Sequence, residues 1–338
     1  MDNYLKALFS CIRFKKPSHQ TRTPASQTRI RSTNNPQHNP ITTYNSYYFD
    51  QYSRISMAEL TAATKNFFPD LILRDITEDI LANSRLSFVY KGQLSNGLVV
   101  AVKKLNSYDF QGVREFRAEM ETLGKIRHRN ILPIVGYCDS DNDRLLVFKF
   151  MERGSLARWL YGAPSDETPL SWERRIKIIR GVANGLLYLH GLENPITHRN
   201  ISASNILLDY DFEAQITHFG LAKRIESSYS TDLVGTMGYW PPEYRNFSCG
   251  KVTLMGDVYS FGVLMLEIAT GWSPKEGVVD RAKEMMVQNS KKQMIDSKIT
   301  RKVLIEANVV KYFKIAFLCI AESPRERPTM TQIVNLLD

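Results

Sequence analysis

The residues that could do chemistry stand in short motifs that follow one another along the chain. They carry lysine, arginine, histidine, carboxylate and amide side chains, which are groups that bind phosphate, hold ions and move protons. Any one of these motifs alone is weak evidence for a function. Their occurrence together, in this order and at this spacing, is very unlikely to arise by chance. The motifs are Val100-Ala101-Val102-Lys103, a helical Glu119, His128-Arg129-Asn130, Thr197 to Asn205, His218-Phe219-Gly220, Gly235 to Glu243, Asp257 to Gly262, and Arg327-Pro328.

The elements that must position these motifs change in kind along the chain. Strand patterns fill residues 71–105, where a β-branched run follows the turn signal Asn96-Gly97, and a buried strand is predicted at 145–150. A strand-rich first part before a helix-rich second part predicts an α+β architecture of two lobes rather than one alternating parallel sheet. Helical spacing of apolar residues predicts helices at 111–126, from 171 onward, at 258–270 and at 309–320.

In this order the motifs resemble those of eukaryotic protein kinases, from about residue 71 to residue 338. Within that superfamily the sequence is similar to plant receptor-like kinases, in their cytoplasmic form that lacks an ectodomain. The resemblance implies a protein kinase-like domain over 71–338, with a small antiparallel β-rich lobe at 71–152 and a larger helical lobe at 153–338. It also implies a chemistry that consists mainly of positioning ATP and stabilising charge.

Three catalytic positions depart from the family pattern. Asn200 stands where the family carries the aspartate base, and an amide is not a useful proton acceptor near neutral pH. Ser202 replaces a lysine whose charge balances the transferred phosphoryl group. His218 replaces the aspartate that binds magnesium, a cation that prefers oxygen ligands. We therefore expect no intact catalytic residue and no magnesium site, although Asn205 still fits the family's metal-binding asparagine.

The glycine-rich phosphate loop of the family is replaced as well. Counted back from Val89, its three glycine positions fall at Ala82, Ser84 and Ser87. Glycine is needed there because a Cβ keeps the backbone amides away from phosphate. Arg85 offers one compensating charge, but an exposed loop arginine is usually just solvated. Together these replacements predict that efficient phosphoryl transfer is lost.

The strand lysine and its helix partner are both present. Lys103 and Glu119 match the family's nucleotide clamp, but the same ion pair would also form if it only docked the helix onto the sheet. ATP binding without efficient turnover therefore stays open. The resemblance places the nucleotide site at Leu81, Val89, Ala101, Lys103, Glu119, Met151 and Asn205.

Residues that hold the fold together in the family are kept. Glu243 and Arg327 match a buried ion pair of the helical lobe, and Asp257 matches the helix aspartate that braces the catalytic loop. Arg199 could also pair with a phosphate added to the segment after His218. The structural positions are His198, Arg199, Glu243, Asp257 and Arg327, and the candidate phosphorylation sites are Ser227, Ser228, Ser230, Thr231 and Thr236.

The first 55 residues differ in composition from the rest. They hold eight basic residues against two acids and are rich in polar residues and proline, which predicts a basic, largely disordered leader over 1–55. Residues 56–70 predict a short helix that begins with a capping box at Ser56. Lipidation of Cys11 beside basic charge would give peripheral association with the plasma membrane, and a solvated basic tail is the alternative.

The cysteine content and the charge distribution exclude several other classes of protein. The four cysteines lack paired spacing, which indicates neither a zinc site nor a disulfide framework and is typical of a cytoplasmic protein. The net charge of +9 is concentrated in the leader, which has no groove-reading element, so nucleic acid is not an expected partner.

We interpret the chain as a regulatory pseudokinase of receptor-linked plant signalling. Rather than act as an enzyme, it would bind active receptor-like kinases or other signalling proteins as a scaffold, allosteric partner or decoy. One alternative is a weakly active Ser/Thr kinase that transfers phosphate from ATP with unconventional residues. Another is a nucleotide-binding switch without turnover.

Overall fold

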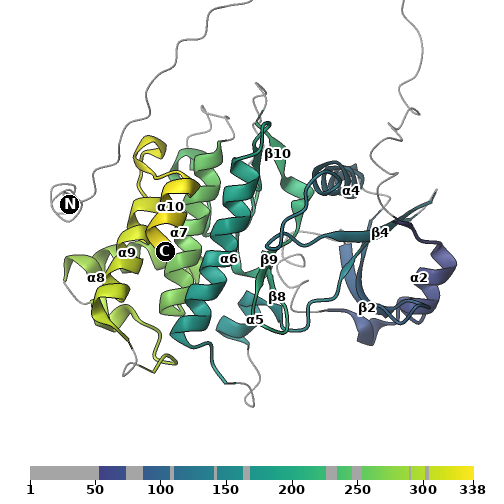
Figure 1. Ribbon diagram of the computed structural model, residues 1–338, viewed down its shortest axis with the longest axis horizontal. Helices are drawn as coiled ribbons and strands as arrows, with labels where there is room; N and C mark the ends of the chain where they lie inside the picture. The colour runs from purple at the N-terminus through teal and green to yellow at the C-terminus, as the bar shows by residue number, and fades with distance from the viewer. Residues whose placement is uncertain are drawn as a thin grey trace, which may run out of the picture. The chain divides into compact units, whose positions relative to one another are not determined.

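The structure is a computed structural model that describes residues 53–73, 87–106, 110–140, 143–162, 168–225, 234–245, 253–288, 291–300 and 304–338. Within these ranges a strand-rich lobe is followed by a helical lobe, so the predicted two-lobe α+β architecture is confirmed (Figure 1). Residues 1–52 of the basic leader, with Cys11, lie outside the described residues, as do the loop positions Leu81, Ala82, Ser84 and Arg85. No helix in the described ranges is long and apolar enough to cross a membrane.

A five-stranded sheet forms the small lobe. Its strands lie in the order β1-β4-β5-β3-β2, and all neighbours are antiparallel except β1 and β4, which are parallel. The turn between β2 and β3 contains Gly97 at a φ of 85°, a conformation that glycine adopts without strain. The strands are β1 (Ser53–Arg54), β2 (Ser87–Gln93), β3 (Val99–Leu105), β4 (Ile134–Asp139) and β5 (Arg144–Lys149).

The sheet begins before the predicted short helix. β1 pairs with β4 from Ser53 onward, so the last residues of the expected leader belong to the small lobe. The backbone N–H of Ile55 continues this contact by donating to the Tyr137 carbonyl at 2.8 Å. Gly136 permits the close approach, because a Cβ at this position would lie 2.6 Å from the Ser53 carbonyl oxygen.

Helix α2 (Met57–Ala63) packs on this sheet. Ser56 Oγ accepts the Glu59 backbone N–H at 3.1 Å, so the predicted N-cap is present. The reciprocal half of the capping box is not formed, because the Glu59 carboxylate accepts the Ser95 backbone N–H at 2.7 Å instead. The core under the helix consists of Leu60, Leu94, Val100, Val102, Cys138, Leu145 and Val147.

Helix α4 (Phe110–Leu123) corresponds to the helix predicted over 111–126 and ends earlier, where Gly124 follows. Its buried face carries two carboxylates one turn apart, Glu115 and Glu119, among apolar side chains. This face packs against the 3-10 turn η4 (Phe219–Leu221) of the large lobe. Helix α4 therefore brings two acids to the boundary between the lobes.

The large lobe is built around helix α7, which is buried along almost its whole length. Most of its residues are apolar, as expected of a helix at the centre of a lobe, but its buried residues also include Asp257 and Glu267. Helix α9 packs closely on it at Gly262, where a Cβ would lie 2.6 Å from Cys319 Cβ. The helices are α5 (Leu156–Tyr161), α6 (Trp172–His190), α7 (Leu254–Thr270), α8 (Val278–Val287), α9 (Glu306–Cys319) and α10 (Met330–Leu337) (Figure 1).

Short strands and 3-10 turns bring the remaining motifs together beside α6. One small sheet has the order β6-β8-β9, and β7 pairs with β10. All of these pairs are antiparallel. The elements are β6 (Gly154–Ser155), β7 (Ile196–Thr197), η3 (Ala203–Asn205), β8 (Ile206–Leu208), β9 (Ala214–Ile216), β10 (Lys223–Arg224) and η5 (Pro242–Arg245).

Candidate functional site

Lys103 is the centre of a buried charged cluster. It lies on β3, and its Nζ is 2.6 Å from Oε1 of Glu119 on α4. Glu115, one turn earlier on α4, places Oε2 3.9 Å from the same Nζ. Burial by itself lowers the pKa of Lys103, but the two carboxylates more than offset it and the pKa is raised. The ammonium is therefore charged and held by α4.

His218 joins this cluster from the large lobe. Its Nδ1 lies 3.2 Å from Lys103 Nζ and 3.9 Å from Glu119 Oε1. Because an ammonium only donates, Nδ1 is the acceptor and the ring proton is on Nε2. Burial, the Lys103 cation and nearby His198 lower the pKa of His218 well below its usual value of 6.5. The cluster thus has a neutral ring nitrogen where the kinase family has a carboxylate.

The segment around His218 is fixed by its backbone and neighbours. His218 has a left-handed backbone conformation with φ of 63°, which histidine adopts more readily than most residues. Phe219 is fully buried and stands edge-on to His198 with ring centroids 4.7 Å apart. A Cβ at Gly220 would lie 2.9 Å from Glu115 Cγ, so glycine lets α4 come this close. These contacts bind α4 to the large lobe.

Asp257 fixes the backbone of the loop that carries Asn200. From the first turn of α7, its Oδ2 accepts the Thr197 hydroxyl, the His198 N–H and His190 Nε2 at 3.0, 2.8 and 3.0 Å. Its Oδ1 accepts the backbone N–H of Arg199 at 2.8 Å. Burial opposes ionisation, but these donors outweigh it and the pKa of Asp257 is lowered. Asp257 therefore occupies the bracing position that the sequence predicts for it.

Asn200 is held in a well-defined place but is no base. Its Oδ1 accepts both the backbone N–H and the hydroxyl of Thr236, at 3.0 and 2.8 Å. Asn205 Nδ2 donates to the Asn200 carbonyl at 2.9 Å, so Asn205 supports the loop. Ser202 is buried, and its Oγ has no hydrogen-bond partner among the described residues. The backbone of the loop is held in place, while the side chains of Asn200 and Ser202 offer neither a proton acceptor nor a cation.

The strand register places apolar side chains on the face that carries Lys103. Val89 lies opposite Lys103 and Ala101 lies opposite Phe148, and residues opposite one another in neighbouring strands share a face. Met151 follows β5, is 3% exposed, and its backbone N–H has no partner among the described residues. The face of the sheet that carries Lys103 is therefore apolar on either side of this residue.

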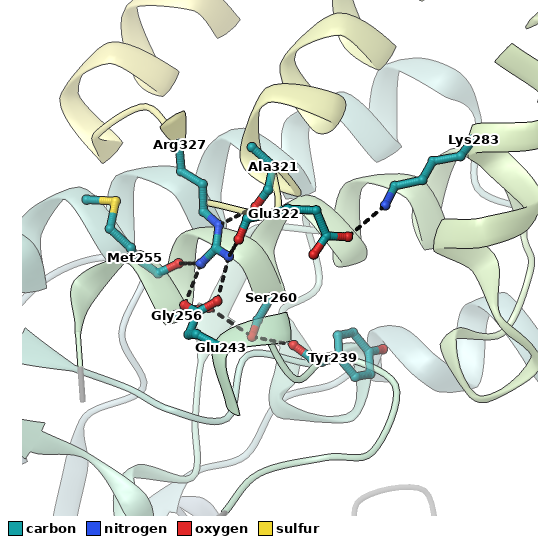
Figure 2. A network of polar contacts seen from close by, with 9 residues as sticks. All are labelled: Tyr239, Glu243, Met255, Gly256, Ser260, Lys283, Ala321, Glu322 and Arg327. Atoms are coloured by element: carbon teal, nitrogen blue, oxygen red, sulfur yellow. Dashed lines mark hydrogen bonds and ion pairs between the residues drawn. The ribbon is translucent and has the colours of Figure 1, made fainter. Parts of the chain in front are cut away.

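The ion pair between Glu243 and Arg327 joins distant parts of the large lobe (Figure 2). Arg327 Nη1 and Nη2 each lie 2.7 Å from a different carboxylate oxygen of Glu243. The guanidinium also donates to the carbonyl oxygens of Met255 and Ala321, both at 2.9 Å. Because the Arg327 side chain is fully buried, it depends on these acceptors to balance its charge.

Two features of the site were missed in the sequence analysis: the buried hydrogen bond between Tyr239 and Glu267, and the second carboxylate, Glu115, beside Lys103. Tyr239 accepts the Ala203 backbone N–H at 3.1 Å and donates its hydroxyl to Glu267. Burial first, and then Glu267, raise the pKa of Tyr239 well above 10.0. Glu115 was missed as well, although its position four residues before Glu119 is a helical-spacing signal. No short-range pattern links Tyr239 to Glu267.

Of the candidate phosphorylation sites, the structure describes only Thr236, which is partly buried and bonded to Asn200. Ser227, Ser228, Ser230 and Thr231 lie outside the described residues. The Arg199 guanidinium, which we expected to receive an added phosphate, donates to the Leu221 carbonyl at 3.4 Å and to Tyr244. Phosphorylation of this segment stays a prediction.

The donor set around Lys103 does not fit magnesium. The group from the large lobe is a neutral ring nitrogen that already accepts from an ammonium, whereas magnesium prefers oxygen ligands. Across the described ranges, no cluster of three or more His, Cys, Asp or Glu side chains could hold a metal ion. The side chains around Lys103 therefore do not form an oxygen-donor site of the kind that magnesium prefers.

The lowered pKa of His218 predicts a pH-dependent stability. The unfolded chain takes up a proton at His218 below about pH 6.5, whereas the folded chain does not, so acidification favours unfolding. As the pH falls below about 6.5, this residue should therefore cost the fold stability. In urea titrations His218→Asn should lose less stability on acidification than the parent does. Equal losses in both proteins would contradict a neutral His218 buried beside Lys103.

The two-lobe fold and the motif geometry define a protein kinase domain. The sequence profile of the family described as protein tyrosine and serine/threonine kinase matches residues 76–337. The chain belongs to this family, in its plant receptor-like branch. The predicted family is thereby confirmed.

Curated relatives share the domain but are longer proteins. The chain is 39% identical over 296 residues to Phytosulfokine receptor 2 of Arabidopsis thaliana, covering 84% of this chain and 28% of the receptor. It is 39% identical over 297 residues to the Leucine-rich repeat receptor protein kinase EMS1 of the same plant, with 84% and 24% covered. The chain thus spans about a quarter of the length of these receptors. A probable receptor-like serine/threonine-protein kinase of Arabidopsis thaliana is 37% identical, with 84% of this chain and 65% of the relative covered.

Proposed function

We propose that this chain is a catalytically impaired receptor-like kinase that signals by binding active receptor-like kinases as a scaffold, allosteric partner or decoy. The observation that supports it is the contact between His218 Nδ1 and the Lys103 ammonium at 3.2 Å. His218 stands at the position from which the family's aspartate would bind a metal ion. Here its side chain makes an internal hydrogen bond with Lys103 instead. The neighbouring base position is the amide of Asn200, which cannot accept the proton of a substrate hydroxyl.

The retained framework supports a binding role for the same domain. The Glu243–Arg327 pair, the Asp257 network and the Lys103–Glu119 pair all have close geometry. These contacts hold the large lobe and helix α4 in a fixed arrangement that could serve as a binding surface. A rigid interface loses little conformational entropy on association, so such a domain can bind without turning over a substrate.

The proposal is tested by a phosphoryl-transfer assay on the full chain, with labelled ATP and either magnesium or manganese. We expect incorporation into a basic protein substrate, and into the chain itself, to equal that of Lys103→Met. Lys104→Met is the matched control, because Lys104 is partly exposed and pairs with Asp143 at 2.9 Å instead. Transfer by the parent and by the Lys104 variant that disappears in Lys103→Met would overturn the proposal in favour of a weakly active kinase.

A partner arm uses the kinase domain of Phytosulfokine receptor 2 as the probe, because its sequence is close to this chain. We expect it to bind the immobilised chain saturably and equally well for the parent and Lys103→Met. Binding that required Lys103 would instead favour a switch controlled by nucleotide. The intact Lys103–Glu119 pair is the observation that keeps this second function in view.

Peripheral membrane attachment through the basic leader is part of the proposal. It rests on the sequence around Cys11, which lies outside the described residues. A lipidated cysteine beside basic charge supplies two membrane signals, the number that stable anchoring needs.

A further inference from the structure

We propose that a cavity in the large lobe, separate from the Lys103 cluster, binds a small aromatic acid that carries a single negative charge. The cavity has a volume of about 600 Å³ and is lined chiefly by residues of helices α6, α9 and α10 (Figure 1). Small-molecule sites have volumes of roughly 300 to 1,000 Å³. None of the lining residues belongs to the Lys103 cluster, so the inference goes beyond the proposed function.

One part of the cavity wall is apolar and aromatic. Trp172 of α6 and Tyr312 of α9 both line it, and their rings stand edge-to-face with centroids 5.1 Å apart. Ile176 and Ile315 line the cavity as well. Trp172, Tyr312 and Ile315 are each at most 7% exposed, so they belong to the packed interior of the lobe. A wall of this composition favours a flat, apolar ring system as the body of the ligand.

Lys311 supplies a positive charge beside the aromatic wall. It directly precedes Tyr312 on α9, lines the cavity, is exposed, and forms no ion pair within the described part of the chain. Arg129 and Lys177 also line the cavity, but both pair with Glu213, at 3.3 and 3.8 Å. The charge of Lys311 is therefore available to the carboxylate of a ligand.

Acidic side chains limit the ligand to a single negative charge. Glu173, Glu213 and Asp338 all line the cavity, and a second negative charge on the ligand would be repelled by them. A phosphate monoester carries about 1.5 to 2 negative charges at neutral pH, whereas a carboxylate carries one. The carboxylate is therefore the better match for this cavity.

Polar contacts tie the walls of the cavity together. Arg180 of α6 donates from Nε and Nη2 to the Leu337 carbonyl of α10, at 3.1 and 2.6 Å. At another part of the wall, Asn130 Nδ2 donates to Glu213 Oε1 at 2.7 Å. These residues all line the cavity. A cavity with walls held in this way loses little conformational entropy when a ligand binds.

The test is a fluorescence titration of the full chain with naphthoate, naphthol, naphthyl phosphate and naphthylmethylamine as probes. We expect naphthoate to bind saturably, with one molecule per chain. Naphthol and naphthylmethylamine should each bind about threefold or more weakly, because they lack the negative charge that pairs with Lys311. The phosphate should bind no more tightly than the carboxylate, because of the acids on the cavity wall.

Two pairs of variants locate the ligand. Asn308→Trp puts a large ring at an exposed position of the cavity wall and should weaken naphthoate binding about tenfold or more, whereas Ala307→Trp, at an exposed neighbour outside the wall, should not. Lys311→Met should weaken naphthoate about threefold to fivefold and leave naphthol unchanged. Lys314→Met, on the same helix but outside the cavity wall, is the control and should change neither.

Four results would each overturn the inference. They are parent protein that binds no probe, equal affinity for naphthoate, naphthol and naphthylmethylamine, tighter binding of the amine than of the acid, and naphthoate binding that Asn308→Trp leaves unchanged. The proposed function is judged separately, because none of these variants touches the Lys103 cluster. Lys103-dependent phosphoryl transfer would refute the proposed function and leave the naphthoate result as it stands.

Discussion

Glu243→Gln should lower the free energy of unfolding by about 3 to 5 kcal/mol, the loss typical of a buried ion pair from which one partner is removed. The glutamine keeps the volume of the side chain but removes the charge that balances Arg327. The Arg327 side chain is fully buried, so water does not replace the lost carboxylate. Urea denaturation of the parent and the variant measures the difference directly.

The matched control lies in the same network. Lys283 and Glu322 form an ion pair of 3.3 Å, but the Glu322 side chain is 74% exposed (Figure 2). Lys283→Met should therefore cost less than about 1 kcal/mol. Adding Arg327→Met to Glu243→Gln should recover part of the loss, because no buried charge then remains unpaired. A loss in Glu243→Gln no larger than that in Lys283→Met would show that the pair is not needed.

Asp257→Asn should cost about 3 kcal/mol and loosen the loop that carries Asn200. Asp257 accepts four hydrogen bonds through two oxygens, and an amide has only one oxygen. In either orientation of the amide, its NH2 group, which can only donate, faces a group that is itself a donor. Arg199, held at a φ of 68° by this contact, would lose the support for its left-handed backbone.

Hydrogen exchange together with urea denaturation checks this result. The backbone amides of His198 and Arg199 should exchange faster in the variant, because both donate to Asp257. Asp70→Asn, at an exposed site, is the control and should change stability by less than about 0.5 kcal/mol. Unchanged exchange at these two amides would contradict the bracing role.

The two variants separate the framework from the chemistry of this domain. Both alter residues that the family uses to hold its fold, and neither touches the Lys103 cluster. If the proposed function is right, each should weaken binding to a partner kinase as the lobe loosens, while phosphoryl transfer stays at background.

The sequence alone determined the family, the two lobes and most of the elements. Strand and helix patterns are local, so β3, β5, α7 and α9 lie where their apolar periodicity predicts them. The replaced positions Asn200, Ser202 and His218 were identified through fixed motif spacing, which does not require coordinates. The same spacing identified the Lys103–Glu119 and Glu243–Arg327 pairs, whose short distances the structure supplies.

Only the tertiary structure decided what the replaced residues do. The contact of His218 with Lys103 joins residues 115 positions apart, and the Tyr239–Glu267 bond joins two helical-lobe segments that share no pattern. The Glu59 carboxylate accepts the Ser95 backbone N–H, a residue 36 positions away that only the fold brings within reach, rather than completing the capping box of its own helix. Such contacts depend on how elements pack and on which groups lose water, and local sequence patterns carry no record of either.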